Sequence, residues 1–405
     1  MNKRRVVYIV TIILSALYIF IGNKMVSKDA NKVESMDDTY IKAKVTKIIS
    51  ITEEPSLAGL TEDDKDTTVT FEAKLLTGDK KGEIIESEQI ITYPNSENAV
   101  GLKEGDRVLI IKAGETDEGI IWKYVDRERI NPVIFLAIIF LILLVIFGKK
   151  KGLNTILALG FTVCSIFMVF IPSILAGYNI YMGCIITCIF IVLSTIIIVY
   201  GIDKKSIATA LGCFGGILIS LLLLVIMDSI IHISGYTSEE SMFMVLLDID
   251  NPINLKAIVF ASIIIGAIGA IMDISIDIAA SLREISYKIK EPTFKEIFKS
   301  GITIGRDIIA TMTNTLVLAY VGSSLSSVVL IIAYNTSLTN LFNKEAIIIE
   351  ILQALIGSLG LLFTIPLTSV ICGIMYSSKG VKNELKELKH NFKNKIIRKG
   401  EITNE

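Results

Sequence analysis

The fold is decided by the stretch Ser262–Ile285, which reads SIIIGAIGAIMDISIDIAASLREI. It belongs to an apolar block over 256–280, in which Asp273 and Asp277 are the only ionisable residues after Lys256 at its start. A helix rises about 1.5 Å per residue, so about 20 apolar residues cross a hydrocarbon core about 30 Å thick. The block therefore predicts a membrane-spanning helix, and its two carboxylates lie where ionisable groups are costly and most often functional.

Working outward, seven more blocks have the length of a span. The whole chain has 405 residues, of which 52% are hydrophobic, and its mean hydropathy is +0.62. The sequence therefore predicts a polytopic α-helical membrane protein with about eight transmembrane helices, including a bundle over 130–376. The other predicted spans are 6–22, 132–148, 153–174, 178–201, 206–232, 307–334 and 346–376.

The distribution of Lys and Arg predicts the orientation of these spans. With the N-terminus inside, the five cytoplasmic pieces carry 3, 3, 2, 6 and 8 Lys or Arg residues, whereas the short loops on the other side carry only Lys344. An excess of basic residues marks the cytoplasmic side. We therefore expect a bacterial plasma-membrane protein with both termini in the cytoplasm. The segment 1–22 is expected to be an uncleaved signal anchor, because no small-residue cleavage site follows it.

The polar segment 23–129 is then expected to be extracytoplasmic. Apolar residues alternate with polar ones in five short runs, and Gly and Asp turns separate the runs. This pattern is typical of β-strands. Five strands in about a hundred residues predict a small β domain, which we interpret as a closed barrel of the OB type.

The basic tail 377–405 is expected to bind the membrane surface. Its apolar residues recur every three or four positions, and lysines fill the other face. Such a helix binds the anionic lipids of the inner leaflet; a solvated helix held by a partner is the alternative. A net charge of −1 gives no reason to expect nucleic acid as a partner.

Common catalytic and cofactor motifs are absent from the sequence. It contains no GxxxxGK[ST] loop, HExxH pair or CxxC pair, and only two histidines. We therefore expect no enzyme, no cofactor and no metal site. A membrane-embedded aspartyl hydrolase stays open as a remote alternative, because Asp273 and Asp307 come from two different helices.

The candidate site is a polar cluster between the sixth and seventh predicted spans. On the sixth, 4-3-4 spacing places Gly266 and Ala270 on one face with Asp273 and Asp277, and small residues there admit a neighbouring helix. On the seventh, Asp307, Thr311 and Asn314 also share a face. Antiparallel packing would bring the two faces to one depth, where they could carry protons or a hard cation.

Two further features accompany this cluster. Arg306, with Arg283, could simply neutralise the acids at a helix end, and Asp307 could be a carboxylate favoured by a helix N-terminus; this structural alternative stays open. The run Ala319–Ser324, which ends in Ser323 and Ser324, is expected to weaken or bend the seventh span midway.

These helices resemble the YibE/F-like family of bacterial multi-pass membrane proteins. The residues that carry the resemblance are GAIGAIMDISIDIAASLREI at 266–285 and GRDIIATMTNTLVLAYVGSSL at 305–325, and the last span continues it with GSLG at 357–360 and IPLT at 365–368. The resemblance covers most of the chain from about residue 130. It implies a membrane protein, and membrane transport as its function.

A second resemblance is one of pattern alone. A glycine-rich helix with an aspartate, a charged cytoplasmic linker and a Thr/Asn-rich helix look like the middle of a permease of the resistance–nodulation–division type. The proton-driven accessory subunits of protein translocation have a similar layout. This likeness implies proton coupling, although the number of spans differs, with an extra hairpin at about 132–174.

The predicted function is therefore secondary transport or proton- or cation-coupled permease activity. Asp273, Asp277 and Asp307 are the expected carriers, with Thr311 and Asn314 as neighbours. The alternative is a non-transporting scaffold or sensor whose β domain binds an envelope partner. The expected surroundings are the lipid bilayer and a second copy of the chain or another membrane partner.

Overall fold

The computed structural model describes residues 3–29, 40–56, 64–92, 101–116, 119–237, 239–246, 252–334 and 337–377. The predicted tail helix lies outside these residues. The chain divides into two compact units, one comprising Met1–Asn31 with Val145–Glu405 and the other Lys32–Leu144. Each unit is described by itself below.

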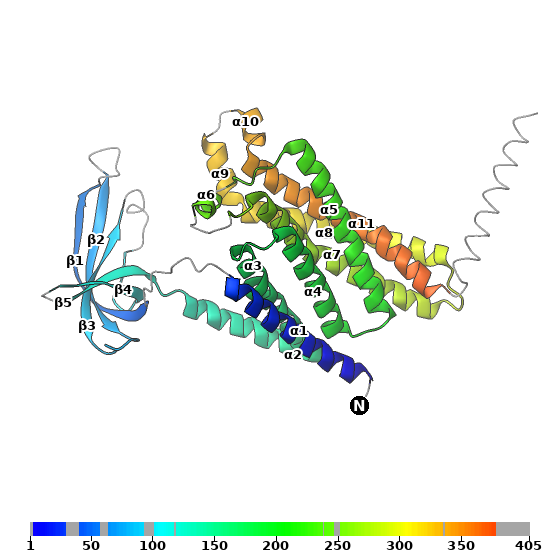
Figure 1. Ribbon diagram of the computed structural model, residues 1–405, viewed down its shortest axis with the longest axis horizontal. Helices are drawn as coiled ribbons and strands as arrows, with labels where there is room; N and C mark the ends of the chain where they lie inside the picture. Colours follow the sequence, from blue (N-terminus) through cyan, green and yellow to red (C-terminus); the bar gives the residue numbers. More distant parts are fainter. Residues whose placement is uncertain are drawn as a thin grey trace, which may run out of the picture. The chain divides into compact units, whose positions relative to one another are not determined.

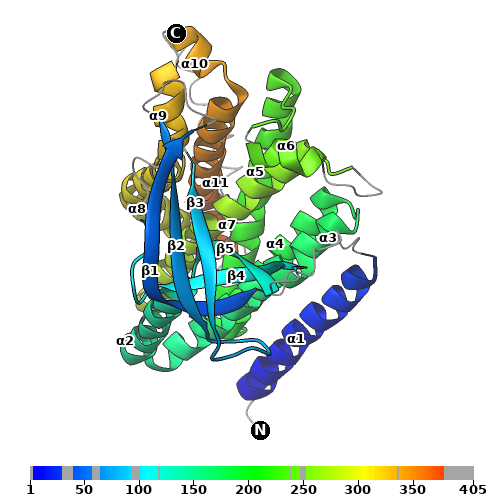
Figure 2. The same cartoon turned by 90° about the vertical axis from the view of Figure 1, so that its left-hand side faces the viewer.

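The smaller unit is a five-stranded antiparallel sheet with the order β3-β2-β1-β4-β5. The long strand β1 pairs with both β2 and β4, and it can be followed in Figures 1 and 2. Five strands are what the sequence predicts. Their bounds are β1 Ile41–Pro55, β2 Lys65–Leu75, β3 Ile84–Ile91, β4 Arg107–Thr116 and β5 Gly119–Arg127.

One side of this sheet forms an apolar core. Alternate residues of β3 are buried, as expected for a strand with one face on a core. Phe71 is fully buried at the centre, and its ring meets that of Tyr124 edge-to-face with centroids 6.2 Å apart. The core therefore arises from the period-two pattern that is visible in the sequence.

The structure does not support the predicted OB-type barrel. Within the described residues, ladder pairing ends at β3 on one side and at β5 on the other. These two edge strands meet through a side chain instead, since the Ser87 hydroxyl donates to the Trp122 carbonyl at 3.0 Å. A side-chain bond leaves edge N–H and C=O groups outside any ladder, so the sheet stays open.

The larger unit is helical. The unit contains the part of α2 (Ile130–Ser165) from Val145 onward. Its other helices are α1 Lys3–Asp29, the π-helix Ile166–Phe170, α3 Ile171–Leu175, α4 Ile180–Tyr200, α5 Lys204–Ile231, α6 Glu239–Val245, α7 Leu255–Lys288, α8 Phe294–Ser323, α9 Leu325–Tyr334, α10 Leu338–Phe342 and α11 Glu345–Tyr376. Figure 1 shows α5, α7, α8 and α11 running close together.

The described residues contain six helical runs long and apolar enough to cross a membrane, or seven if the bent pair α8–α9 forms one span. Such runs make the chain an integral membrane protein. The sequence predicts eight spans because 132–148 and 153–174 count separately. In the structure these two blocks fall in one 46-residue run, Ile130–Leu175, which consists of two helices that meet at a kink, with a non-helical backbone at Lys149 (φ 48°, ψ −127°).

The connection between α7 and α8 is shorter than the sequence suggests. The sequence pattern ends the sixth span at 280 and begins the seventh at 307, but α7 continues to Lys288 and α8 already begins at Phe294. A capping box starts α8, in which the Thr293 hydroxyl accepts from the Glu296 N–H and the Glu296 carboxylate accepts from the Thr293 N–H. This reciprocal cap satisfies two free N–H groups of the first turn.

The predicted break in the seventh span is confirmed. α8 ends at Ser323, and the axis of the following helix is bent by 67° from it. Ser324 closes the helix end, since its N–H donates to the Tyr320 carbonyl at 3.1 Å. Both serine hydroxyls donate to the same carbonyl, at 2.8 Å from Ser323 and 3.0 Å from Ser324.

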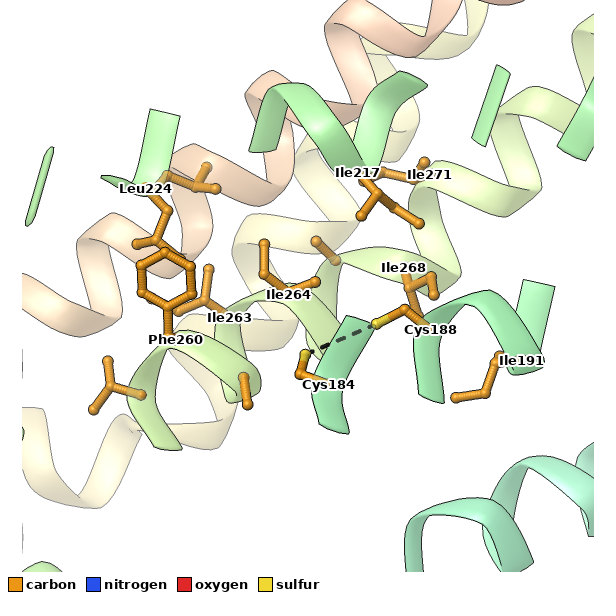
Figure 3. Packing of buried hydrophobic residues seen from close by; sticks show 14 of the residues in the cluster. Cys184, Cys188, Ile191, Ile217, Leu224, Phe260, Ile263, Ile264, Ile268 and Ile271 are labelled. Atoms are coloured by element: carbon orange, nitrogen blue, oxygen red, sulfur yellow. Dashed lines mark hydrogen bonds between the residues drawn. The ribbon is translucent and has the colours of Figure 1, made fainter. Parts of the chain in front are cut away.

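The core of the helical unit lies between α4, α5, α7 and α11. Figure 3 shows Phe260, Ile264 and Leu224 packed together with the buried pair Cys184 and Cys188. The two sulfur atoms are 3.9 Å apart, and both cysteines are free. They pack as small apolar side chains in this cluster.

Candidate functional site

The carboxylates Asp273 and Asp277 lie on the outer stripe of α7. Gly266 and Gly269 lie on the same stripe, and all four residues are exposed. The opposite side of α7 is fully buried, with Ile271 among its residues. An exposed carboxylate on a membrane-spanning helix is costly in lipid, so this stripe requires a water-filled crevice or a second protein surface beside it.

One titratable neighbour of these acids belongs to α4. Both Asp273 and Asp277 lie within electrostatic range of Tyr200, the last residue of α4. Among the described side chains, neither aspartate forms an ion pair or hydrogen bond. The two acids are therefore close enough to the end of α4 to influence Tyr200, but they are not bonded to it.

Arg283 does not neutralise the α7 aspartates. Its guanidinium donates to Asp203 at 2.5 Å. Asp203 also caps α5, where it accepts the Ser206 N–H at 2.8 Å. Burial acts to raise the pKa of Asp203, but the bonds from Ser206 and the charge of Arg283 outweigh it and hold that pKa below its usual range. Arg283 therefore neutralises an acid at a helix end, as the structural alternative proposes, but that acid is Asp203.

Asp307 lies in the interior of α8. The helix begins at Phe294, thirteen residues earlier, which is about 20 Å along the axis. The expectation that Asp307 is favoured by a helix N-terminus is therefore wrong, because that effect fades within the first turn. Asp307, Thr311 and Asn314 are all exposed, and so is Arg306, whereas the sequence predicts that their common face packs against the sixth span.

Two close approaches define how α7 and α8 align. A Cβ on Gly301 would lie 3.0 Å from Leu282, and a Cβ on Gly266 would lie 3.0 Å from the Tyr320 hydroxyl oxygen. The helices are therefore antiparallel. Interpolation between the two contacts places Asp277 level with Asp307, and Asp273 level with Thr311.

The side chains of the two helices are not joined at that level. Ala270 packs with α8 residues in a hydrophobic cluster, and the aspartates lie on the neighbouring stripe. In the part of the chain that the structure describes, no hydrogen bond or ion pair connects Asp273 or Asp277 with Asp307. The Thr311 hydroxyl donates to the Ile308 carbonyl of its own helix at 3.0 Å.

Sequence reasoning missed a second polar feature, which we call the hydroxyl interface. It is the contact of α5 with α11 and α7, formed by Thr209, Gly212, Gly216, Ser220, Ser275, Gly360, Thr364 and Thr368. A Cβ on Gly212 would lie 2.1 Å from Thr368 Oγ1, and one on Gly216 would lie 2.0 Å from Thr364 Oγ1. The GxxxG spacing of Gly212 and Gly216 on α5 is thus a packing face.

The hydroxyl interface buries polar atoms in the middle of the bundle. The Ser275 hydroxyl donates to the Thr209 carbonyl at 2.8 Å and lies 3.1 Å from Thr368 Oγ1. In the described residues, the hydroxyls of Thr209, Ser220 and Ser358 have no hydrogen-bond partner. The glycine spacing was the signal in the sequence, but it could not show that the facing helix carries threonines.

These geometries define what the helical unit offers chemically. The α7 and α8 stripes carry carboxylates and hydroxyls, which suit protons or hard cations. Groups of three or more His, Cys, Asp or Glu that could hold a metal ion are not found in the described parts of the chain.

Comparison with known proteins gives one match. No curated protein and no solved structure matches the chain. The model of the YibE/F-like protein family matches residues 136–378, which is more than half of the chain and includes α7, α8 and α11. The chain therefore belongs to the YibE/F-like protein family.

Proposed function

We propose that the protein is a proton- or cation-coupled permease in which Asp273, Asp277 and Asp307 carry the coupling ion. The observation that supports this most is the exposed pair of carboxylates on α7 without an ion-pair partner among the described residues. Ionisable residues at membrane depth persist where they serve an ion path.

The level of Asp307 supports the same proposal. Antiparallel packing brings Asp277 level with Asp307, and Asp273 level with Thr311, although these side chains lie on separate stripes. A rotation of α8 relative to α7 would change the distance between the carboxylates. Two arrangements with different ion affinity are what coupled transport requires.

Proton movement in liposomes tests this function. The purified full-length chain is reconstituted with a pH dye inside, a membrane potential is imposed, and the D273N/D277N double variant is compared with the native protein. We expect proton flux to fall at least about tenfold, because an amide cannot take up and release the proton.

Glu284→Gln is the matched control. Glu284 is an exposed acid further along α7, beyond the apolar block, and its replacement should leave the flux unchanged. Native flux in the double variant would overturn the assignment of the carriers. A loss of flux in the Glu284 variant as well would indicate a general effect of charge on reconstitution.

A second candidate function is a scaffold or sensor that binds an extended segment of an envelope partner. The observation that favours it is a groove of about 600 Å³ along the edges β3 and β5, lined by Ile90, Ile121 and Val125, which are all exposed. Open edge strands pair with extended peptides through their backbone groups.

Deletion of residues 40–128 distinguishes the two candidates. A permease should keep its proton flux without this domain, whereas a sensor should lose its response to the partner. Flux that vanishes in the deletion variant, with normal membrane insertion, would place the β domain within the transport mechanism.

A further inference from the structure

A groove between α4, α5 and α7 lies far along the helices from the aspartate stripe. Its volume is about 420 Å³, within the usual range of ligand sites. One end holds the ion pair Asp228–Lys256, with 2.7 Å between Lys256 Nζ and Asp228 Oδ2. The other lining residues are Tyr181, Cys184, Ile185, Leu221, Val225, Phe260 and Ala261.

The ion pair lies at the level of the helix ends. Asp228 belongs to the last turn of α5, which ends at Ile231, and Lys256 belongs to the first turn of α7, which begins at Leu255. Leu221 lies ten residues before the end of α5, about 15 Å deeper. The groove therefore has charges at headgroup level and apolar walls at acyl-chain level.

The floor and the rim of the groove differ in exposure. Cys184, Phe260 and Ala261 are buried and form the floor. Ile185 and Val225 form the rim, and Val225 is 55% exposed. Because exposed apolar residues of membrane helices contact lipid, the groove opens sideways toward the bilayer.

The charges at the end of the groove are only partly compensated. Asp228 is 17% exposed, and its second oxygen, Oδ1, is buried without a hydrogen-bond partner among the described residues. The Lys256 ammonium is 38% exposed and has donor capacity beyond Asp228. A ligand that offers an N–H donor to the exposed part of the Asp228 carboxylate and an anionic oxygen to Lys256 would complement both charges.

We propose that this groove binds one phospholipid with an ethanolamine-type headgroup. Its phosphate accepts from Lys256, its primary ammonium donates to Asp228, and an acyl chain fills the apolar groove. A choline headgroup has no N–H to donate, and a glycerol headgroup brings no positive charge to Asp228. This site is independent of the proposed transport function.

Lipid retention measures the proposal directly. The full-length protein is purified in detergent, incubated with equal amounts of phospholipids that carry ethanolamine, choline and glycerol headgroups, and analysed by native mass spectrometry. We expect the ethanolamine lipid to be retained about tenfold over the other two, a difference of about 1.4 kcal/mol. Equal retention of all three would overturn the proposal.

Three variants locate the site. Asp228→Asn should reduce the preference for ethanolamine to the level of choline, and Lys256→Gln should lower retention of all three lipids. Val225→Trp should fill the groove and exclude the lipid. Its matched control is Ile226→Trp, because Ile226 is the next residue, has a similarly exposed side chain and lies outside the groove lining.

The variants also separate a folding defect from a loss of binding. Val225 and Ile226 are exposed, so both tryptophans should leave the protein monodisperse with native helix content. An unchanged preference in the Asp228 and Val225 variants, or an equal loss in the Ile226 control, would contradict the assignment of this groove.

Discussion

Replacing Gly216 by Ala should destabilise the helical unit through the hydroxyl interface. The new Cβ would lie 2.0 Å from Thr364 Oγ1 and 2.9 Å from Ile271 Cγ2, whereas ordinary contacts are about 3.5–4.0 Å. Thr364 cannot rotate away freely, because its hydroxyl donates to the Gly360 carbonyl at 2.7 Å. The helices α5 and α11 would therefore have to separate by about 1.5 Å.

The expected cost follows from these contacts. Overpacking costs about 1–3 kcal/mol, and loss of the Thr364 bond adds about 1 kcal/mol. Higher helix propensity of Ala returns about 1 kcal/mol. The net loss is about 1–3 kcal/mol, which corresponds to roughly 2–12 °C in the midpoint of thermal unfolding.

Thermal unfolding in detergent, followed by size-exclusion chromatography, measures this loss. Gly160→Ala is the control, because no described atom lies within 4 Å of a Cβ built there. It should leave the midpoint unchanged or raise it. The double variant Gly216→Ala with Thr364→Ala should recover at least half of the loss. Equal midpoints for the Gly216 and Gly160 variants, or no recovery in the double variant, would refute the reasoning.

Two further predictions concern ion pairs. Asp203→Ala should cost about 1–2 kcal/mol at neutral pH, because it removes the cap of α5 and the partner of Arg283. The pKa of Asp203 is lowered in the folded protein, so this stabilisation is present above about pH 4. It is lost as the pH falls through the pKa of Asp203 in the folded protein. The melting temperature of the variant should therefore fall less with acidification than that of the native protein. In the β domain, Glu128 is 1% exposed and pairs with Lys42. Glu128→Gln should cost this domain about 1–3 kcal/mol of stability and so make it more sensitive to limited proteolysis. Glu83→Gln, which changes an exposed ion pair, should leave the sensitivity unchanged. Equal sensitivity of the two variants would contradict this.

The sequence predicts the elements of this fold better than their boundaries. The five strands follow from alternation and turn residues, and the apolar spans follow from their length. Lys149–Lys151 predict a boundary between two spans, and the backbone does break at Lys149, but the helix resumes at once because lysine is a good helix former. The start of α8 could have been predicted from the sequence, because Thr293 and Glu296 have the spacing of a capping box.

The candidate site was predictable in part for a similar reason. Helical spacing places Asp307, Thr311 and Asn314 on one face, and the structure shows all three exposed. Spacing within one helix does not say which neighbour faces it, because that depends on the crossing of helices. The proximity of Asp273 to Tyr200, and the pairing of Arg283 with Asp203, therefore needed the structure.

The hydroxyl interface has a mechanical consequence. Thr364, and Ser369 where α11 meets α8, donate to carbonyls of their own helix, at 2.7 Å in both cases, so these bonds move with α11. Ser275 bridges α7 to α5 through the Thr209 carbonyl. A glycine surface without large interlocking side chains lets one helix slide along another, which is the shear type of motion. A shift of α11 along α5 would thus keep the bonds of Thr364 and Ser369 and break the Ser275–Thr368 contact, while the Ser275 bond to Thr209 holds α7 in step with α5.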